Sequence, residues 1–285
     1  MTLVLGCLTH RFVVQVSDQQ ITDAVTGEVL ETNRNKATMY CSYMAFAYSG
    51  VGTIAGEHTD IWMAKTLGRH TTLNAAGEGL RDEATLEFRR WGAPSARTRH
   101  AFVGIGWGMR PGETHFRPLQ ATISNALDSD GQWLSIARPE FEIDGVGLSE
   151  ESKYFLCAPI GAPLPDNELR SLKKNMVKCV QQGAAPWAFI RLLGEAIRRV
   201  AQGNSEVGST LNAIVVPPPA PKNGMHVLMT ALTPSGLSPL IGTAPLDEPM
   251  FLNLSASDEV TQSMPNFACN GGVAVGFRRI PPTMR

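Results

Sequence analysis

The sequence predicts an α+β fold built from antiparallel sheets and paired helices. Strand-like segments fill the first fifty residues, and apolar residues then recur at helical spacing between residues 60 and 91. The same order, strands followed by two helices, occurs a second time before a strand at 211–216. Segregated runs of this kind are typical of layered α+β proteins. We therefore expect a four-layer αββα sandwich, in which two sheets face each other and each carries a helix pair on its outer face.

The composition is that of an ordinary globular protein. The chain has 285 residues, of which 43% are hydrophobic, so it can bury a sizeable core. Its net charge of −1, with acidic and basic residues mixed along the chain, does not indicate a nucleic-acid partner. No apolar run approaches the roughly 18 residues of a membrane span, and the N-terminus lacks the pattern of a signal peptide. We expect a cytoplasmic protein with no nucleic-acid or membrane partner.

The cysteines and histidines do not have the spacing of a metal site. The five cysteines are odd in number and widely spaced, without a CxxC pair, and the six histidines are scattered. These patterns favour buried free thiols over a disulfide framework, and they predict no metal and no cofactor. The cysteines are Cys7, Cys41, Cys157, Cys179 and Cys269.

The first fifty residues are expected to form two antiparallel hairpins. Short apolar segments separated by polar turns predict strands at 3–8, 12–17, 36–41 and 43–49. Phe12, Val14 and Val16 share one face of the second strand, opposite Val13 and Gln15.

Two helix pairs follow in the sequence. The predicted helices are 60–67, 78–91, 166–181 and 186–203. Trp91 lies on the apolar stripe of the second helix, and Trp187 opens the stripe of the fourth. Gly183 is placed to end the third helix, and Pro186 is placed to begin the fourth.

The remaining strands are expected after each helix pair, and strands from the two ends of the pattern can share a sheet. They are predicted at 100–107, 114–127, 133–143, 154–158, 211–216 and 225–231. We interpret residues 2–240 as one domain, and 241–285 as a C-terminal extension that does not form a separate domain.

A threonine near the start of the chain suggests hydrolytic chemistry. A hydroxyl must lose its proton to a nearby base as it attacks an amide. If Met1 is removed, the free α-amine of Thr2 is such a base, with a reference pKa near ~8. A neighbouring ammonium lowers that pKa and favours the alkoxide, a carboxylate balances the ammonium, and a backbone N–H stabilises the oxyanion.

The residues that could supply these groups lie at the starts and ends of the first strands. Asp18 follows the strand that pairs with the one beginning after Thr2, Lys36 begins the second hairpin, and Gly50 ends it. In antiparallel hairpins such positions gather at one edge of the sheet. We therefore expect Thr2, Asp18, Lys36 and Gly50 to converge, with Asp18 and Lys36 as a buried ion pair.

This segment resembles the start of the proteasome β-subunit family of amino-terminal nucleophile (Ntn) hydrolases, which includes bacterial relatives. Sixteen positions separate Thr2 from Asp18 and fourteen separate Lys36 from Gly50, as in the family. The family's Asp-Arg-Arg-x-Thr block corresponds to 18–22, which ends in Thr22. The motifs are specific over residues 2–60, and the likeness extends to about 231.

The resemblance implies a role for each of these residues. Thr2 would be the nucleophile with its own amine as base, Lys36 would tune the pKa values, and Asp18 would hold Lys36. The Gly50 N–H would be the oxyanion donor, and the backbone of Thr22, Gly50 and Gly52 would pair with an extended substrate. The candidate supporting residues are Ser17, Asn204 and Ser209.

The chain departs from the family pattern in the groups that support the site. Glutamines 19 and 20 replace the arginine pair, and Ala162, after Gly161, replaces a serine. In the segment 204–209, Asn204 stands for an aspartate and Val207 for a serine.

The resulting hypothesis is a threonine peptidase that cleaves peptide or amide bonds. The resemblance further implies a self-compartmentalising homo-oligomeric ring, a polypeptide substrate and an unfoldase partner. Two alternatives stay open: a catalytically silent structural or interaction protein on the same fold, and a hydrolase of small amides.

Overall fold

The structure, a computed structural model, has the α+β composition that the sequence predicts. It describes residues 2–219 except 24, 25, 27, 42, 110–114 and 129–130, together with the backbone of six short strands between 231 and 274. The helices in this part are α1 (Thr59–Gly68), α2 (Leu73–Arg90), α3 (Asp166–Gln181) and α4 (Pro186–Gly203), with a short 3₁₀ helix at Ala96–Thr98.

The first sheet has the strand order β12-β1-β2-β14-β17-β18, with β13 also paired to β1. These strands are β1 (Leu3–Thr9), β2 (Val13–Asp18), β12 (Tyr154–Leu156), β13 (Ile160–Gly161), β14 (Leu211–Val216), β17 (Met250–Leu254) and β18 (Val260–Gln262). Its pairs are antiparallel, and β14 lies beside β2 with Leu211 opposite Asp18. Strands from the two ends of the pattern therefore share a sheet, as predicted.

The second sheet has the order β11-β10-β9-β6-β5-β19-β20. Its strands are β5 (Ala37–Tyr40), β6 (Met44–Ser49), β9 (Ala101–Gly108), β10 (Arg117–Ser124), β11 (Glu142–Gly147), β19 (Asn266–Cys269) and β20 (Gly272–Ala274). Its pairs are antiparallel except for the parallel contact of β19 with β5. Three two-stranded ribbons complete the described strands: β3 (Ile21–Thr22) with β4 (Val29–Glu31), β7 (Thr53–Ile54) with β8 (Glu57–His58), and β15 (Ala231–Thr233) with β16 (Gly236–Ser238).

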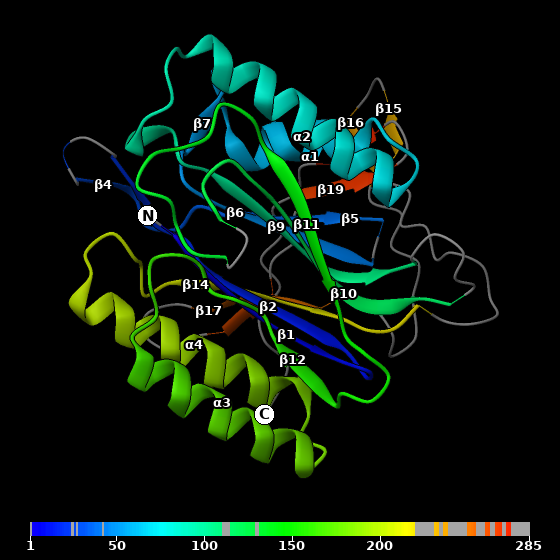
Figure 1. The fold of residues 1–285 in the computed structure, drawn as a ribbon. Coiled ribbons are helices and arrows are strands. Elements are labelled where there is room, and N and C mark those ends of the chain that lie inside the picture. Colours follow the sequence, from blue (N-terminus) through cyan, green and yellow to red (C-terminus); the bar gives the residue numbers. More distant parts are fainter. Residues whose placement is uncertain are drawn as a thin grey trace.

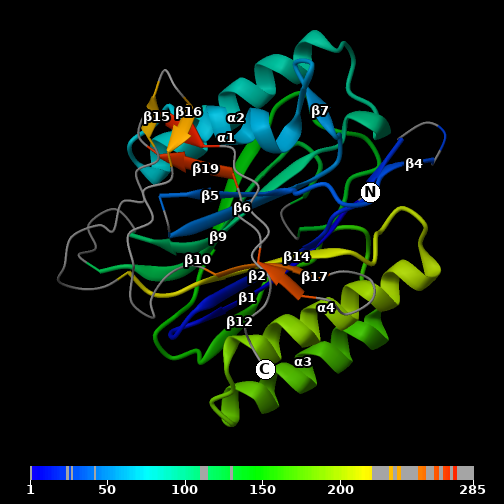
Figure 2. The same ribbon diagram turned by 180° about the vertical axis from the view of Figure 1, so that it is seen from behind.

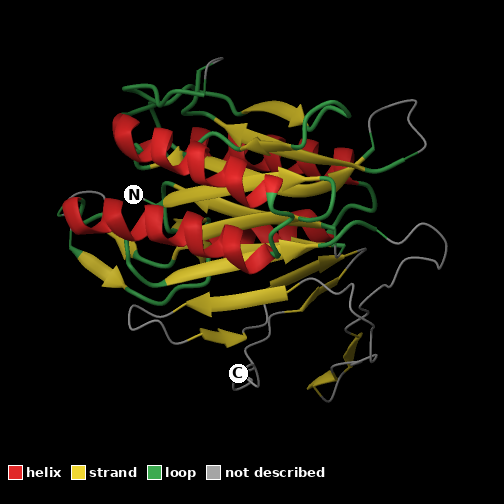
Figure 3. Ribbon diagram, turned by 90° about the horizontal axis from the view of Figure 1, so that it is seen from below, coloured by secondary structure: helices red, strands yellow, loops and turns green. Residues whose placement is uncertain are grey.

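Three apolar clusters hold the elements together. One joins α1 and α2 to the outer face of the second sheet, and another joins α3 and α4 to the first sheet. The third lies between the two sheets. Figure 1 shows the two helix pairs on opposite sides of the strands, and Figure 3 shows α3 and α4 side by side across them. Phe12, Val14 and Val16 share one face, as predicted, and this face packs against α3 and α4, whereas Val13 faces the other sheet.

The helix ends follow the expected local chemistry. Helix α3 ends as predicted, with Gly183 beyond it at φ +61°, and α4 begins with Pro186 at its first position. Helix α2 begins five residues earlier than predicted, because the hydroxyl of Thr72 accepts a hydrogen bond from the Ala75 N–H and caps it.

Several expectations were wrong in detail. The region 133–141 makes only an isolated bridge between Trp133 and Leu127 before β11 begins at Glu142, because Pro139 has no N–H for a strand ladder. Trp91 and Trp187 are 41% and 44% exposed, so neither belongs to a buried stripe.

Other predictions touch residues that the structure does not describe. The strand predicted at 225–231 lies outside the described residues except for Ala231, and the start of the one predicted at 114–127 does too. Among the described helices, none is long and apolar enough to cross a membrane.

Strands from the last part of the chain join both sheets. Figure 2 shows β17 beside β14 and β19 beside β5, in agreement with their pairing registers. The division of the chain at residue 240 stays a prediction, and these strands place the backbone of the C-terminal segment at the edges of the same two sheets.

Candidate active site

The predicted nucleophile lies at the start of a central strand of the first sheet. Thr2 immediately precedes β1, and the antiparallel register of β1 and β2 places Val4 opposite Ser17. The end of β2 therefore lies beside the start of β1, where the Leu3 N–H donates to Asp18 Oδ1 at 2.8 Å. Two of the four predicted residues thus meet because of hairpin register alone.

Lys36 reaches this point from the other sheet. It immediately precedes β5, and its Nζ donates to Thr2 Oγ1 at 2.5 Å and to Asp18 Oδ2 at 3.3 Å. The same ammonium also donates to the backbone carbonyl of Gln20. Burial lowers the pKa of Lys36, while the carboxylate of Asp18 opposes this shift. A buried lysine of lowered pKa in contact with a hydroxyl is suited to share its proton with that oxygen.

The carboxylate of Asp18 is fully buried and well compensated. Its Oδ1 accepts from Leu3, and its Oδ2 accepts from Lys36 and from the backbone N–H groups of Gln20 at 3.1 Å and Gly208 at 3.2 Å. Four donors from four separate segments therefore fix this charge in place. Such a network holds Lys36 in a single position beside Thr2.

The backbone carbonyl of Thr2 is held by two donors that do not belong to the Asp18 network. It accepts from the Ser49 hydroxyl at 3.1 Å and from the Ala162 N–H at 2.9 Å. A Cβ on Gly161 would lie 1.6 Å from this carbonyl oxygen, and Gly161 has φ +105°, so only glycine fits there. The departure at Ala162 therefore removes a hydroxyl but keeps a backbone hydrogen bond to Thr2.

Gly50 lies next to this cluster, in the loop that follows β6. It has φ +124°, and a Cβ there would meet the carbonyl of Arg99 at 2.5 Å. A cavity of about 480 Å³ opens beside it. Thr22, Gly50 and Gly52, the three predicted substrate contacts, all line this cavity. Arg97, Arg99, Trp133, Asp23, Glu31 and Glu206 are among the polar and aromatic residues of its wall.

A chain of hydrogen bonds between side-chain amides lies next to the site and was not predicted. The Gln19 side chain donates to Asn212 Oδ1 at 2.6 Å, and Asn212 donates to Asn35 Oδ1 at 2.9 Å. Asn35 Oδ1 also accepts from the Ala37 N–H, so the chain braces the backbone on both sides of Lys36. A polar Asn212 within the apolar strand β14 was the signal in the sequence that could have indicated it.

The second glutamine of this pair connects to the loop that follows α4. The Gln20 side chain donates to the Ser205 carbonyl at 2.5 Å and to the Thr22 hydroxyl at 3.2 Å. At the positions where the family pattern has arginines, Gln19 therefore bonds strand β14 and Gln20 bonds the loop after α4.

The three candidate supporting residues lie in different surroundings. Ser209 is exposed, and the Asn204 side chain accepts from the Glu206 N–H and closes a local turn. Val207 is buried in the core between the first sheet and its helices. Ser17 is buried in β2 beside Asp18. The group from the 204–209 loop that reaches the site is the Gly208 N–H, which a comparison of side-chain types could not show.

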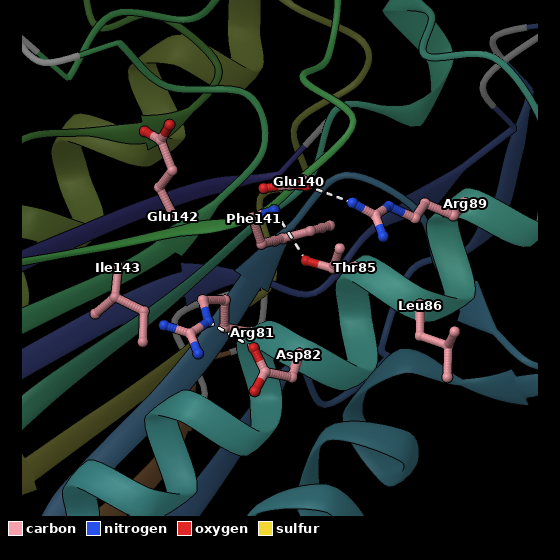
Figure 4. A pocket seen from close by; sticks show the side chains of 9 residues that line it. All are labelled: Arg81, Asp82, Thr85, Leu86, Arg89, Glu140, Phe141, Glu142 and Ile143. Carbon is pink, nitrogen blue, oxygen red and sulfur yellow. Dashed lines mark hydrogen bonds and ion pairs between the residues drawn. The ribbon is translucent and has the colours of Figure 1, made fainter.

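A larger cavity of about 810 Å³ lies elsewhere, between α2 and the start of β11. Figure 4 shows two ion pairs among its charged groups, Arg81 with Asp82 and Arg89 with Glu140, whereas Glu142 pairs with none of the residues drawn. The Thr85 hydroxyl accepts from the Phe141 N–H. Among the described residues, none of the hydroxyls that line this cavity contacts a buried lysine. The cavity beside Gly50 is the better candidate for a substrate site, because it opens next to the Thr2–Lys36 contact, although Thr2 itself does not line it.

The thiols agree only in part with the prediction of buried free cysteines. Cys7 and Cys157 are buried, and burial raises the pKa of both thiols, to about 12 for Cys7. Cys41 and Cys179 form no disulfide and are half-buried, and the Cys269 side chain lies outside the described residues. In the part of the chain that the structure describes, no three His, Cys, Asp or Glu residues gather as a metal site would require.

Comparisons with known proteins find similarity among solved structures only. No protein-family model matches the chain, and no curated protein matches it. Among solved structures, the chain is similar to the Gly-1 mutant of Anbu from Hyphomicrobium sp. strain MC1. The TM-score is 0.46 and the identity 13%, over 76% of this chain and 82% of that chain. A similarity at this level carries no argument about the chemistry of the site, which is inferred from the geometry of its own residues.

Proposed function

We propose that this protein is a threonine-type Ntn hydrolase that cleaves peptide or amide bonds, with Thr2 as nucleophile after removal of Met1. The observation that carries the proposal is the buried Lys36 ammonium, which contacts both the Thr2 hydroxyl and the Asp18 carboxylate. A buried charge pair is a poor way to stabilise a core, and its contact with a hydroxyl at the first residue of a strand favours catalysis.

In the proposed reaction, the free α-amine of Thr2 takes the hydroxyl proton as Oγ1 attacks the substrate carbonyl carbon. Lys36 donates a hydrogen bond to Oγ1 and stabilises its developing negative charge. The carbonyl π electrons move to its oxygen, and the Gly50 N–H stabilises the resulting oxyanion.

The intermediate then collapses to an ester on Thr2. The C–N bond breaks, and the Thr2 ammonium gives its proton to the leaving amine. Water, deprotonated by the same amine, attacks the ester and releases the carboxylic acid. Thr2 regains its hydroxyl proton, so the enzyme returns to its starting state.

The cavity beside Gly50 suits an extended substrate. The short strand β3 and the loop 50–52 present backbone groups on its wall, and an extended peptide can pair with such groups as an added strand. This favours a peptide over a small amide, which needs no strand-like backbone on the cavity wall.

The finer features of the proposal rest on the resemblance to the proteasome β-subunit family. We propose that the elements form the αββα sandwich of Ntn hydrolases, and that copies assemble as a homo-oligomeric ring in the cytoplasm. Under this proposal the substrate is a polypeptide, and an unfoldase partner can deliver it.

The test begins with intact-mass analysis of purified protein and labelling by a peptide epoxyketone or boronate. Loss of Met1, labelling at Thr2, and loss of both labelling and hydrolysis in Thr2→Ala support the proposal. Thr9→Ala is the matched control, because Thr9 is a buried threonine at the other end of β1. It should keep the activity.

The outcomes also separate the alternatives. Retained Met1 together with no labelling would favour a catalytically silent protein. Hydrolysis of small amides but not of a peptide library would favour the small-amide hydrolase. Full activity in Lys36→Ala would show that Lys36 does not tune the nucleophile.

A further inference from the structure

We propose that His100 is a positioning residue for the oxyanion site, a role that rests on the proposed function. His100 lies immediately before β9, where the register places Ser49 opposite Ala101. Its Nδ1 accepts a hydrogen bond from the Val51 N–H at 3.1 Å. His100 would thereby hold the peptide that follows Gly50 and, through it, the direction of the Gly50 N–H.

The loop around Gly50 needs the hydrogen bond to His100 because glycine can adopt a wide range of backbone conformations. On one side, Ser49 is fixed at the end of β6 and its hydroxyl bonds the Thr2 carbonyl. On the other side, Val51 is fixed by His100, and the Val51 carbonyl accepts from the Thr59 hydroxyl at 2.8 Å. Gly50 therefore lies between two held peptides, and release of the second would let it rotate.

The imidazole is itself held in place from several sides. It is buried, it stacks on Tyr48 with ring centroids 5.8 Å apart, and it packs edge-on against Phe102 at 4.4 Å. The backbone of His100 is fixed as well: its N–H donates to Asn125 Oδ1 at 2.8 Å, and its carbonyl accepts from the Ser124 hydroxyl at 2.9 Å. Because the ring is fixed in this way, its Nδ1 holds the Val51 N–H in one position.

The contacts of the ring also define its proton state. Because Nδ1 accepts from Val51, the proton of the neutral ring is on Nε2. Within the described residues Nε2 is buried and has no hydrogen-bond partner. Burial lowers the pKa of His100 to about 3, so the Nδ1 lone pair is available throughout the neutral range. The ring acts as a constant acceptor and takes no part in proton transfer.

The test compares two substitutions in the full-length protein. His100→Leu removes the acceptor, whereas His100→Asn can place an amide oxygen near the position of Nδ1. For a peptide substrate, we expect His100→Leu to lower kcat at least ~10-fold with KM within about twofold, because a misplaced donor weakens only transition-state binding. Inhibition by a peptide boronate, which forms a tetrahedral adduct, should weaken in parallel. His100→Asn should restore most of both.

A second measurement reports on the structure without activity. Amide hydrogen exchange at Val51 should be slow in the wild type and in His100→Asn and fast in His100→Leu. Phe141→Leu is the packing control, because Phe141 lies against the same imidazole with centroids 6.3 Å apart. It should lose stability but keep kcat and Val51 protection. If His100→Leu does not fold, His100→Gln replaces it, because its longer side chain places the amide away from the Nδ1 position.

The outcomes distinguish this inference from the proposed function. If the wild type is active and the variant without the acceptor (His100→Leu or His100→Gln) has the same kcat, the positioning role of His100 is overturned and the proposed function is not. A kcat loss that Phe141→Leu reproduces, or that His100→Asn does not recover, also overturns it. A wild type that neither hydrolyses peptides nor reacts at Thr2 overturns the proposed function, and the catalytic role of His100 with it.

Discussion

Substitution of Asp18 by Asn tests the network that holds Lys36. Asp18 Oδ2 accepts from three donors, which are Lys36, Gln20 and Gly208. An asparagine either places its NH₂ group against these three donors or flips and places it against the Leu3 N–H. In both orientations buried donors lose their acceptor, and the ammonium of Lys36 loses its counter-charge.

The expected cost of Asp18→Asn follows from this geometry. Breaking a fully buried pair by removing one partner costs about 3–5 kcal/mol, since the remaining charge is left uncompensated. This is a large fraction of the roughly 5–15 kcal/mol by which a typical domain is stable. In a Lys36→Met background no buried ammonium remains, so the same substitution should cost about 2 kcal/mol less.

The assay is urea unfolding at pH 7, followed by fluorescence, for the wild type, both single variants and the double variant. Asp144→Asn is the control, because this carboxylate is exposed on β11 and should contribute within about 0.5 kcal/mol. An Asp18→Asn cost below about 1 kcal/mol would refute the reasoning. So would an equal cost in the presence and absence of Lys36.

Three further predictions follow from the same structure. Gly161→Ala should reduce both stability and kcat strongly, because its Cβ would overlap the Thr2 carbonyl; thermal unfolding and peptide hydrolysis measure the two effects. Ser49→Ala should lower kcat about 10-fold with a stability loss near 1 kcal/mol, because one hydrogen bond to Thr2 disappears; an unchanged kcat would contradict this. The folded pKa of His100, about 3, lies below its usual 6.5, so the unfolded chain binds a proton that the folded chain lacks between these values. Stability should therefore fall by about 1.4 kcal/mol per pH unit as pH decreases through this window. Urea unfolding from pH 7 to 4 should show this slope, and His100→Asn should remove it.

The parts of the site that the sequence could predict are those set by strand register. Thr2 and Asp18 meet because a short hairpin leaves only one plausible antiparallel pairing, and alternation of apolar residues fixes which face each strand buries. Lys36 could be predicted with them because it begins the next hairpin. The fold class followed in the same way, from the change of apolar period along the chain.

The remaining contacts depend on the paths of loops that come together from distant parts of the chain. The Gly208 N–H reaches Asp18 over 190 positions, and no side-chain pattern marks a backbone donor. The sequence did not distinguish His100 from the other five histidines, since its proposed role depends on which backbone N–H lies beside it. The exposure of Trp187 also depends on tertiary packing, because Phe189 of the same helix takes the buried position and packs edge-on against Phe12 at 5.2 Å.

The wide separation of the site's residues along the chain also determines when their contacts can form during synthesis. The Gly208 N–H, which completes the hydrogen-bond network around Asp18, is made 206 residues after Thr2. At typical synthesis rates this interval is about 10–40 s. Throughout that time Asp18 lacks one of its four hydrogen-bond donors, so the network that holds Lys36 beside Thr2 is incomplete. The contacts that position Lys36 beside Thr2 are therefore complete only after residue 208 has been made.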